Sequence, residues 1–262
     1  MAKANEEIAT ILHEAYQTLE PTHFISESYD LTEEEAYATQ ALLIDKIKQA
    51  QQTDVAGYKV SMTSAATQSI ANTNEPAYGT ILKNVVYHTG ATIELSKCFS
   101  PLIELELMFI LSDRLSQDPS VEEIVNKVHV APGIEVPDAR YIDWFPNFTL
   151  SDLIADNTAT GLIVVGEDVD PLSYEAFADI QMELTHQQAH KGSGEGSEVL
   201  GNPINAIKWL ARKLATQGQS LQRGQIISSG TFMSPIPAAL GTYKAQFSHV
   251  GEVNVCLLYT SD

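Results

Sequence analysis

The sequence has few positively charged side chains for its length. Its 262 residues contain 15 Lys and Arg against 34 Asp and Glu, which gives a formal charge of −19 at pH 7. A field of this sign repels nucleic acids and anionic membrane surfaces, so we expect neither as a partner. The same field opposes an anionic small molecule. Any site for an organic acid therefore needs a local positive centre, such as a metal ion or a buried lysine.

Cysteines and long apolar runs are also scarce. Cys98 and Cys256 are far apart and outside any C-x-x-C pattern, which argues against structural zinc and is typical of a reducing compartment. No stretch approaches the roughly 20 apolar residues of a membrane helix, and residues 1–7 lack the basic and apolar segments of a leader peptide. We therefore expect a cytoplasmic protein without a membrane span.

Helical signals occupy the first fifty residues. Two apolar stripes at helical spacing predict two helices, each with one buried face. The stripes are Ile8, Ile11, Leu12, Ala15 and Leu19 in the first helix, and Tyr37, Ala41, Ile44 and Ile47 in the second. Pro21 ends the first helix, whereas Thr32 and Glu35 have the spacing of a capping box that begins the second. These signals predict an N-terminal helical cap over residues 1–52.

The remainder, residues 53–262, is rich in short β-branched and aromatic runs separated by Gly, Pro and Asn, which indicates many short strands. Examples are residues 85–88, 105–110, 162–165 and 253–257. One further helix is expected over residues 203–217. Strands and helices do not alternate regularly, so the sequence predicts an α+β fold in which a β-rich domain forms one compact unit with the cap.

Two glutamates form the first candidate for a metal site. Residues 101–109 have the pattern of a strand, in which Glu104 and Glu106 point to the same face. Two adjacent carboxylates repel each other unless a cation lies between them, and oxygen ligands select a hard ion such as Mg²⁺, Mn²⁺ or Ca²⁺. Spacing alone favours a simpler alternative, in which both side chains lie on the solvent face of an amphipathic strand.

Two isolated charges in apolar segments strengthen the metal hypothesis. Glu135 is a lone acid in a strand-like run bounded by prolines, so we expect it to face inward, where a carboxylate needs a partner. Lys59 is a lone cation among apolar and small residues, where it could bind a substrate carboxylate or move a proton. A structural ion pair is an equally good interpretation of Lys59. The nearby Tyr141, Trp144, Phe145 and Phe148 fit either a cavity wall or simple core.

Eight short motifs follow one another over nearly the whole chain. They cover residues 31–37, 57–64, 75–79, 101–109, 134–141, 155–159, 200–203 with 209–211, and 226–231. Each motif is weak alone, but in this order the chain resembles the 2-keto-4-pentenoate hydratase and 4-oxalocrotonate decarboxylase family, a branch of the fumarylacetoacetate hydrolase superfamily. The resemblance implies a β-rich roll with outer helices, a small 2-oxo acid substrate and a homo-oligomer, and it allows a complex with a homologous pathway enzyme.

The resemblance also assigns residues to the site. It implies Mg²⁺ or Mn²⁺ held by Glu104, Glu106 and Glu135, with Lys59 as a catalytic residue in the same pocket. It assigns substrate binding, or support of the substrate, to Ser64, Asp156, Asn157, Ser229, Gly230 and Thr231. A metal that chelates the carboxylate and the 2-oxo oxygen accepts negative charge, so one such site serves either hydration or decarboxylation.

Two positions depart from the family pattern. Hydratases of this family typically have Asp where this chain has Ala77, so Glu75 or Tyr78 is expected to compensate as a catalytic group. Residues 60–62 read Val-Ser-Met in place of the usual Ile/Met-Gly-Leu, which predicts a shifted backbone beside Lys59. We place a 2-hydroxypenta-2,4-dienoate hydratase first and a 2-oxo-3-enedioate decarboxylase second. A non-catalytic 2-oxo-acid-binding or partner subunit, and C–C bond hydrolysis of an acylpyruvate, are further alternatives.

Overall fold

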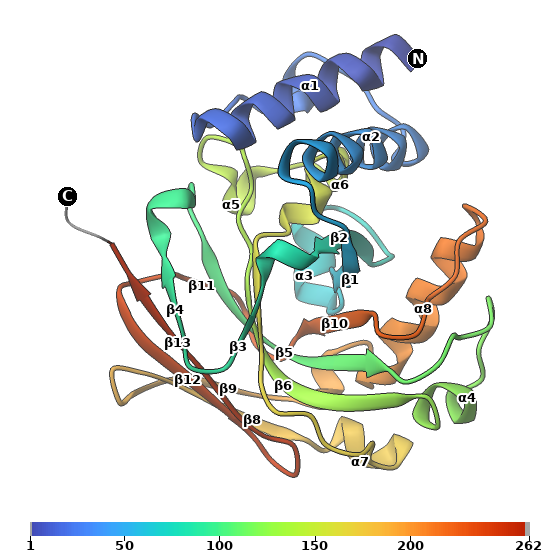
Figure 1. The fold of residues 1–262 in the computed structure, drawn as a ribbon, viewed down its shortest axis with the longest axis vertical. Coiled ribbons are helices and arrows are strands. Elements are labelled where there is room, and N and C mark those ends of the chain that lie inside the picture. The colour runs from blue at the N-terminus through green and yellow to red at the C-terminus, as the bar shows by residue number, and fades with distance from the viewer. Residues whose placement is uncertain (1, 260–262) are drawn as a thin grey trace.

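The chain folds into two β-sheets packed face to face, with helices on the outside (Figure 1). The computed structural model describes residues 2–259. The strands of the larger sheet are β1 (Val55–Ser61), β2 (Ala77–Leu82), β3 (Val86–His88), β5 (Leu102–Leu111), β6 (Val128–Val136), β7 (Leu162–Val165), β10 (Ile226–Thr231) and β11 (Ile236–Pro237). They follow the order β2-β1-β10-β5-β6-β7-β3, and β11 pairs with β5.

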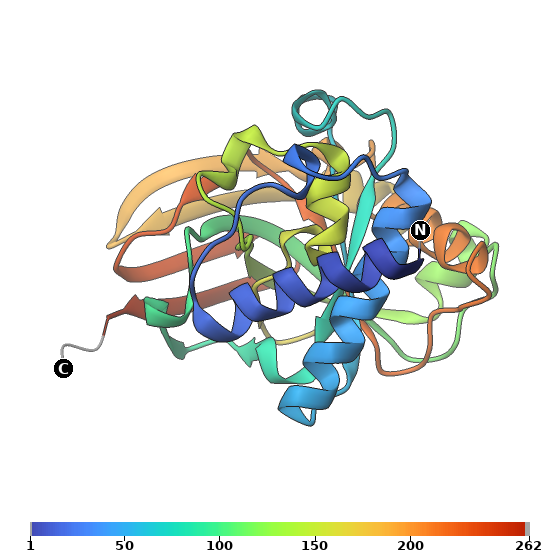
Figure 2. The ribbon, with the colours of Figure 1, turned by 90° about the horizontal axis from the view of Figure 1, so that it is seen from above.

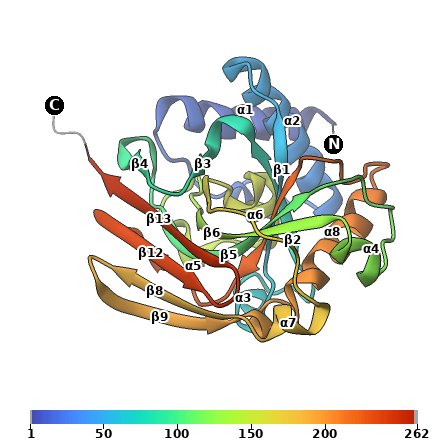
Figure 3. The same ribbon diagram turned by 60° about the horizontal axis from the view of Figure 1, so that its bottom comes forward.

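The smaller sheet covers one face of the larger one (Figure 3). Its strands are β4 (Ala91–Glu94), β8 (Gln181–His186), β9 (Ala189–Glu195), β12 (Gly241–Phe247) and β13 (Gly251–Leu258). They follow the order β4-β13-β12-β8-β9, and β12 and β13 contact β6. Buried side chains of alternating strand positions fill the space between the sheets, as expected for stacked sheets.

Two long helices lie over the larger sheet (Figure 2). The helices of the chain are α1 (Ala2–Thr18), α2 (Glu33–Gln51), α3 (Ala65–Ile70), α4 (Val121–Val125), α5 (Trp144–Asn147), α6 (Leu150–Ala155), α7 (Tyr174–Ala178) and α8 (Pro203–Ala215). Helix α1 packs on α2, α2 packs on α6, and α8 packs on α4 and β10. Among residues 2–259, no helix is both long and apolar enough to cross a membrane.

The predicted start of α2 is confirmed. Thr32 accepts a hydrogen bond from the backbone N–H of Glu35, whose side chain accepts one from the backbone of Thr32. The predicted stripes are wrong at one position each, because Leu19 lies beyond the end of α1 with a left-handed backbone and 42% exposure, and Ala41 faces solvent. The division into a cap and a β-rich domain stays a prediction, since one apolar core continues through both.

Candidate metal centre and substrate pocket

Three glutamates from two neighbouring strands meet inside the larger sheet. Glu104 and Glu106 are two residues apart on β5, and Glu104 is paired across the sheet with Glu135 on antiparallel β6. One carboxylate oxygen from each residue lies within 4.8 Å of the others. Glu106 and Glu135 are fully buried and Glu104 is partly buried, so the solvent-face alternative for Glu104 and Glu106 is wrong.

The buried carboxylates lack partners for some of their oxygens. Burial and the neighbouring Glu135 raise the pKa of Glu104 to about 7, and burial with Glu135 and Glu104 raises the pKa of Glu106 well above its usual value. Among residues 2–259, Oε1 of Glu106 and Oε2 of Glu135 accept no hydrogen bond. Buried charges without donors are costly unless a cation compensates them. The oxygen donors are those of a hard divalent ion, so the cluster fits the predicted metal.

Lys59 is the cation that faces this cluster. It lies on β1, it is 2% exposed, and its Nζ is 3.0 Å from Oε1 of Glu135. Burial alone would lower the pKa of Lys59, but the carboxylates of Glu135, Glu104 and Glu106 outweigh burial and raise it. The lysine is therefore an ammonium that can donate a proton. Its strand pairs regularly with β2 and β10 at this residue, Met62 has a left-handed backbone with φ of 58°, and the backbone shift beside Lys59 stays a prediction.

Strand β10 holds Glu106 in place. The hydroxyl of Ser228 and the backbone N–H of Gly230 both donate to Oε2 of Glu106, the latter at 2.8 Å. Gly230 has φ of +113°, and a Cβ there would lie 2.4 Å from Oγ1 of Thr63, so only glycine fits without displacing its neighbours. The sequence analysis missed Ser228. Ser228 is identified by its pairing with Lys59 across β1 and β10, and this pairing cannot be read from the sequence.

A small pocket opens beside the cluster. Its volume open to a water-sized sphere is about 20 Å³, which is room for one water or one ion. Lys59, Glu104, Glu106, Ser61, Thr63 and Thr231 provide its polar side, and Ile70, Trp144, Phe145, Phe148, Leu153 and Pro235 contribute apolar walls. Trp144, Phe145 and Phe148, which follow β6, thus line the pocket and also pack in the apolar core. A five-carbon acid needs more space, so these side chains must move when it binds.

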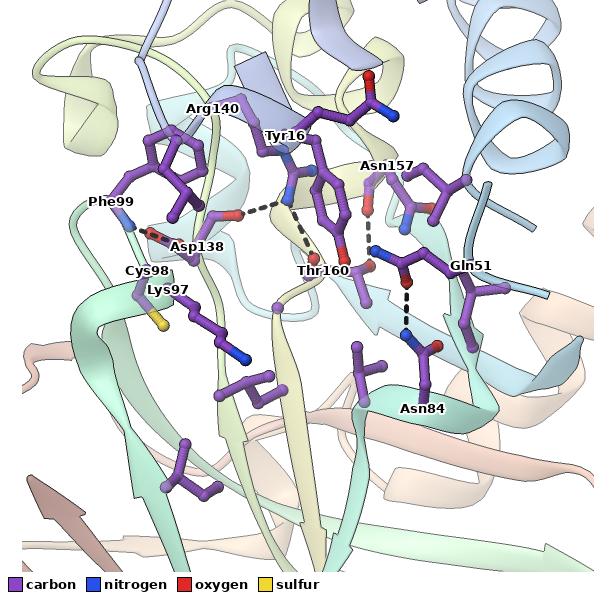
Figure 4. Close-up of a pocket in the computed structure, with 18 of the residues that line it drawn as sticks. Tyr16, Gln51, Asn84, Lys97, Cys98, Phe99, Asp138, Arg140, Asn157 and Thr160 are labelled. Carbon is purple, nitrogen blue, oxygen red and sulfur yellow. Dashed lines mark hydrogen bonds between the residues drawn. The ribbon is translucent and has the colours of Figure 1, made fainter. Parts of the chain in front are cut away.

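A second and larger cavity lies elsewhere (Figure 4). It has about 800 Å³ and lies between the α1–α2 pair and the β3–β4 region, and none of the three glutamates lines it. A short left-handed turn separates the two cavities, since Asn157 faces the large one while Thr158 and Ala159 face the small one. All three have φ near +50°, a strained conformation outside glycine.

A buried ion pair supports this turn. The guanidinium of Arg140 donates to the carboxylate and the carbonyl of Asp156. It also donates to the carbonyls of Asp138 and Thr160 (Figure 4). Burial raises the pKa of Asp156 to about 6, although Arg140 opposes that rise. The sequence analysis missed Arg140 as well. Its position as a lone cation between buried apolar residues was the available signal.

Comparison with known proteins identifies the family. The chain is 31% identical to 2-oxo-hept-4-ene-1,7-dioate hydratase of Escherichia coli over 256 residues, which cover 94% of this chain and 95% of that protein. It is 34% identical to 2-hydroxyhexa-2,4-dienoate hydratase of Comamonas testosteroni over 219 residues, which cover 81% of each protein. The chain belongs to the 2-keto-4-pentenoate hydratase family. This member of the hydratase family is thus an enzyme of the lyase class, as predicted. No family model matches the chain.

Solved structures share the fold of this family member. The 4-oxalocrotonate decarboxylase of Pseudomonas putida G7, complexed with magnesium and adipate, superposes with a TM-score of 0.91 over 98% of both chains at 22% identity. Fumarylpyruvate hydrolase of Pseudomonas aeruginosa, in complex with Mn²⁺ and pyruvate, superposes with a TM-score of 0.60 over 78% of this chain and 89% of its own at 16% identity. These likenesses confirm the predicted α+β roll of the fumarylacetoacetate hydrolase type.

The two compensating catalytic residues expected in this hydratase-family chain lie outside the pocket. Tyr78 is paired with Val60, so its ring is on the sheet face opposite Lys59, where its hydroxyl donates to Gln217 at 2.8 Å. Glu75 is a largely exposed side chain, 3.8 Å from Lys213. Neither side chain lies beside the carboxylate cluster in this structure, and both assignments stay predictions. Strand register, which decides the face of Tyr78, is the physical reason for its position.

The substrate-binding assignments are only partly matched by the geometry. Thr231 lines the pocket, and Gly230 uses its N–H for Glu106. The hydroxyl of Ser229 is buried without a hydrogen-bond partner among residues 2–259, outside the pocket lining. Ser64 caps α3 by accepting the N–H of Thr67.

Asp156 and Asn157 likewise have structural partners. Both carboxylate oxygens of Asp156 accept hydrogen bonds from Arg140, and the side-chain amide of Asn157 bonds the backbone N–H and carbonyl of Thr80. Their polar groups are thus used within the fold, where they support the wall of the pocket. Their assignment to substrate binding stays a prediction.

Proposed function

We propose that this protein is a divalent-metal-dependent hydratase that converts 2-hydroxypenta-2,4-dienoate into 4-hydroxy-2-oxopentanoate. One observation carries the proposal: three clustered glutamates, two of them fully buried with unsatisfied oxygens, lie beside Lys59 in a member of a hydratase family. The names of its relatives describe hydratases of short unsaturated 2-oxo or 2-hydroxy acids. The substrate of this chain is expected to be of the same chemical class.

Glu104, Glu106 and Glu135 would hold the cation. Three carboxylates and one ammonium leave two negative charges in a buried cluster, which a divalent ion neutralises. Oxygen-only ligation suits Mg²⁺ or Mn²⁺ better than softer metals. When bound, such an ion chelates the carboxylate and the 2-oxo oxygen of the substrate and stabilises negative charge on the latter.

Lys59 moves the protons in this proposal. Its ammonium gives a proton to C5 of the dienol and receives one from the 2-hydroxyl, which yields the conjugated 2-oxopent-3-enoate. Water then adds across the C3–C4 double bond, with oxygen on C4 and hydrogen on C3. The sum of the two steps is the addition of one water. The carboxylates of Glu135, Glu104 and Glu106 outweigh burial and raise the pKa of Lys59, so the group is charged and holds the proton that it gives to C5.

Decarboxylation of a 2-oxo-3-enedioate is the second candidate. It is favoured by Ala77, a fully buried methyl group at the position where hydratases of the family typically have Asp. Its substrate, however, carries a second carboxylate at the far end. Lys59 is the only basic side chain among the described residues that line the pocket, and it already faces Glu135. We therefore place hydration first.

The test compares two lysine variants of the metal-loaded enzyme. Lys59→Gln should bind Mn²⁺ but lose turnover of 2-hydroxypenta-2,4-dienoate, measured by ultraviolet absorbance and product mass. Lys83→Gln, which removes the same charge from an exposed site, should behave like the unchanged enzyme. Full activity of Lys59→Gln would exclude this proton path.

The assembly is part of the proposal too. We expect a homo-oligomer that associates with no nucleic acid or membrane, and a complex with a homologous pathway enzyme is a further expectation. Light scattering of the purified protein gives its subunit number, and a cytoplasmic location stays a prediction until fractionation tests it.

A further inference from the structure

Ser61 and Ala77 form a directly opposed pair in the larger sheet. They are partners in the antiparallel register of β1 and β2, two residues beyond the pair of Lys59 and Gly79. Residues two apart on a strand point to the same face, so Ser61 and Ala77 share the face of Lys59. Of this opposed pair, only Ser61 carries a polar group.

The hydroxyl of Ser61 is not used by the fold. It lines the metal-centre pocket, it is partly exposed to that pocket, and among residues 2–259 its side chain has no hydrogen-bond partner. Other hydroxyls around the pocket are engaged: Thr67 bonds within the cap of α3, and Thr231 donates to the carbonyl of Met233. The hydroxyl of Thr63 also lacks a hydrogen-bond partner among residues 2–259, but Thr63 is packed against Gly230 and almost fully buried. Ser61 therefore offers the more accessible of the two free hydroxyls that line the pocket.

We propose that Ser61 positions the water that adds to C4 of the substrate. This inference rests on the hydration proposed above. Ser61 accepts a hydrogen bond from the water, whose oxygen bonds to C4 as the π electrons of the C3–C4 bond move to C3. Lys59 gives a proton to C3 and takes the one that the water loses, so one H₂O is added and Ser61 keeps its own proton.

The spacing on β1 suits this division of roles. Lys59 and Ser61 are two residues apart, so their Cα atoms are roughly 6.6 Å apart along the strand. A five-carbon acid between the carboxylate cluster and the aromatic wall thus meets a proton donor and a water-binding hydroxyl from the same strand. The methyl group of Ala77 opposite Ser61 is fully buried and does not compete for the hydrogen bonds of the water.

Ser61→Ala separates this role from a structural one. Loss of one hydrogen bond to the reacting water is expected to lower kcat for hydration roughly 5- to 100-fold. Substrate KM, Mn²⁺ affinity and thermal stability should stay the same. Ketonisation should also persist, measured as deuterium incorporation at C5 in D₂O, because that step uses Lys59 and no added water. Ser69→Ala, an exposed serine on α3 outside the pocket, is the matched control.

A second variant tests the geometry. Cβ atoms of directly opposed residues are about 4.5–5.5 Å apart, so a carboxylate at position 77 reaches the same water. Ser61→Ala combined with Ala77→Asp should regain hydration lost in Ser61→Ala. Full hydration by Ser61→Ala, or joint loss of hydration, ketonisation and metal binding, would overturn the inference. If the wild-type enzyme ketonises the substrate but never hydrates it, both the proposed function and this inference are overturned. If the wild type hydrates the substrate and Ser61→Ala hydrates it equally well, only this inference is overturned.

Discussion

Glu104 and Glu135 lie directly opposite each other on antiparallel β5 and β6, and one carboxylate oxygen of each lies within 4.8 Å of the other. Two like charges directly opposite each other across strands destabilise a sheet unless a cation joins them. Glu106 adds a third carboxylate to the same space, and Lys59 offsets only one of them. The larger sheet therefore encloses more carboxylates than Lys59 can neutralise, and a divalent ion would compensate the remaining negative charge.

Removing Glu106 tests this relationship. Glu106→Gln keeps the shape of the side chain but removes the charge of a metal ligand. Loss of a residue that only hydrogen-bonds a ligand lowers metal affinity roughly 10- to 100-fold, so this change should lower it more. Turnover should disappear at ordinary Mg²⁺ concentrations while the metal-free protein stays folded. Calorimetric titration with Mn²⁺ and a thermal melt measure both. Glu122→Gln, an exposed acid on α4, controls for net charge, and equal Mn²⁺ affinity in the two variants would remove Glu106 from the metal site.

The metal-free enzyme should lose stability as pH rises. Burial and Glu135 raise the pKa of Glu104 from 4.5 to about 7 in the folded chain. Within that window the folded state binds a proton that the unfolded state has released, so the free energy of unfolding decreases with increasing pH. The melting temperature of metal-free protein should therefore be lower at about pH 8 than at about pH 6, and Mg²⁺ should restore it most strongly at the higher pH. Glu104→Gln should flatten this dependence; an unchanged slope would contradict the assignment.

Ser228 is expected to strengthen metal binding because it holds the Glu106 carboxylate in place. Ser228→Ala removes a donor from the Glu106 carboxylate and should weaken Mn²⁺ binding roughly 10- to 100-fold. Ser229→Ala, the next residue, removes a hydroxyl without a hydrogen-bond partner among residues 2–259 and should leave Mn²⁺ affinity unchanged. The same calorimetric titration distinguishes them. Equal losses in both variants would point to a general disturbance of β10 and against the Ser228 contact.

Loss of the Arg140–Asp156 pair should lower the free energy of unfolding. Arg140→Met leaves a buried carboxylate without its cation, which is expected to cost about 3–5 kcal/mol of unfolding free energy. Arg212→Met breaks a pair with Asp118 of which both members are exposed, and should cause no measurable change. Urea unfolding of the two variants provides the comparison. A small effect of Arg140→Met would show that the Asn157–Ala159 turn is held by other contacts.

Features that depend on local patterns could be predicted from the sequence. The Thr32–Glu35 capping box and the common face of Glu104 and Glu106 follow from spacing within one element. The inward position of Glu135 follows from its apolar neighbours. Features that depend on pairing between elements were missed, because strand alternation defines two faces but does not say which of them meets the pocket. Register places Tyr78 on the face opposite Lys59 and brings Ser228 to Glu106.

The residues around the left-handed turn illustrate the same limit. The resemblance to the family implies that Asp156 and Asn157 bind the substrate or support its site. Their partners, Arg140 and the backbone of Thr80, are 16 and 77 positions away in the sequence. No periodicity connects such segments, so only the folded chain shows that these polar groups are already satisfied.

One measurement tests the central claim most directly. Purified enzyme is freed of metal with a chelator, reloaded with Mg²⁺, and supplied in parallel with 2-hydroxypenta-2,4-dienoate and 2-oxohex-3-enedioate, with ultraviolet absorbance and product mass recorded. Since an unpaired carboxylate in an apolar wall costs several kcal/mol, the account predicts Mg²⁺-dependent gain of one water by the first substrate, with kcat/KM at least about 100-fold above any reaction of the second. Loss of CO₂ from the second substrate without hydration of the first, or turnover that persists without metal, would contradict it.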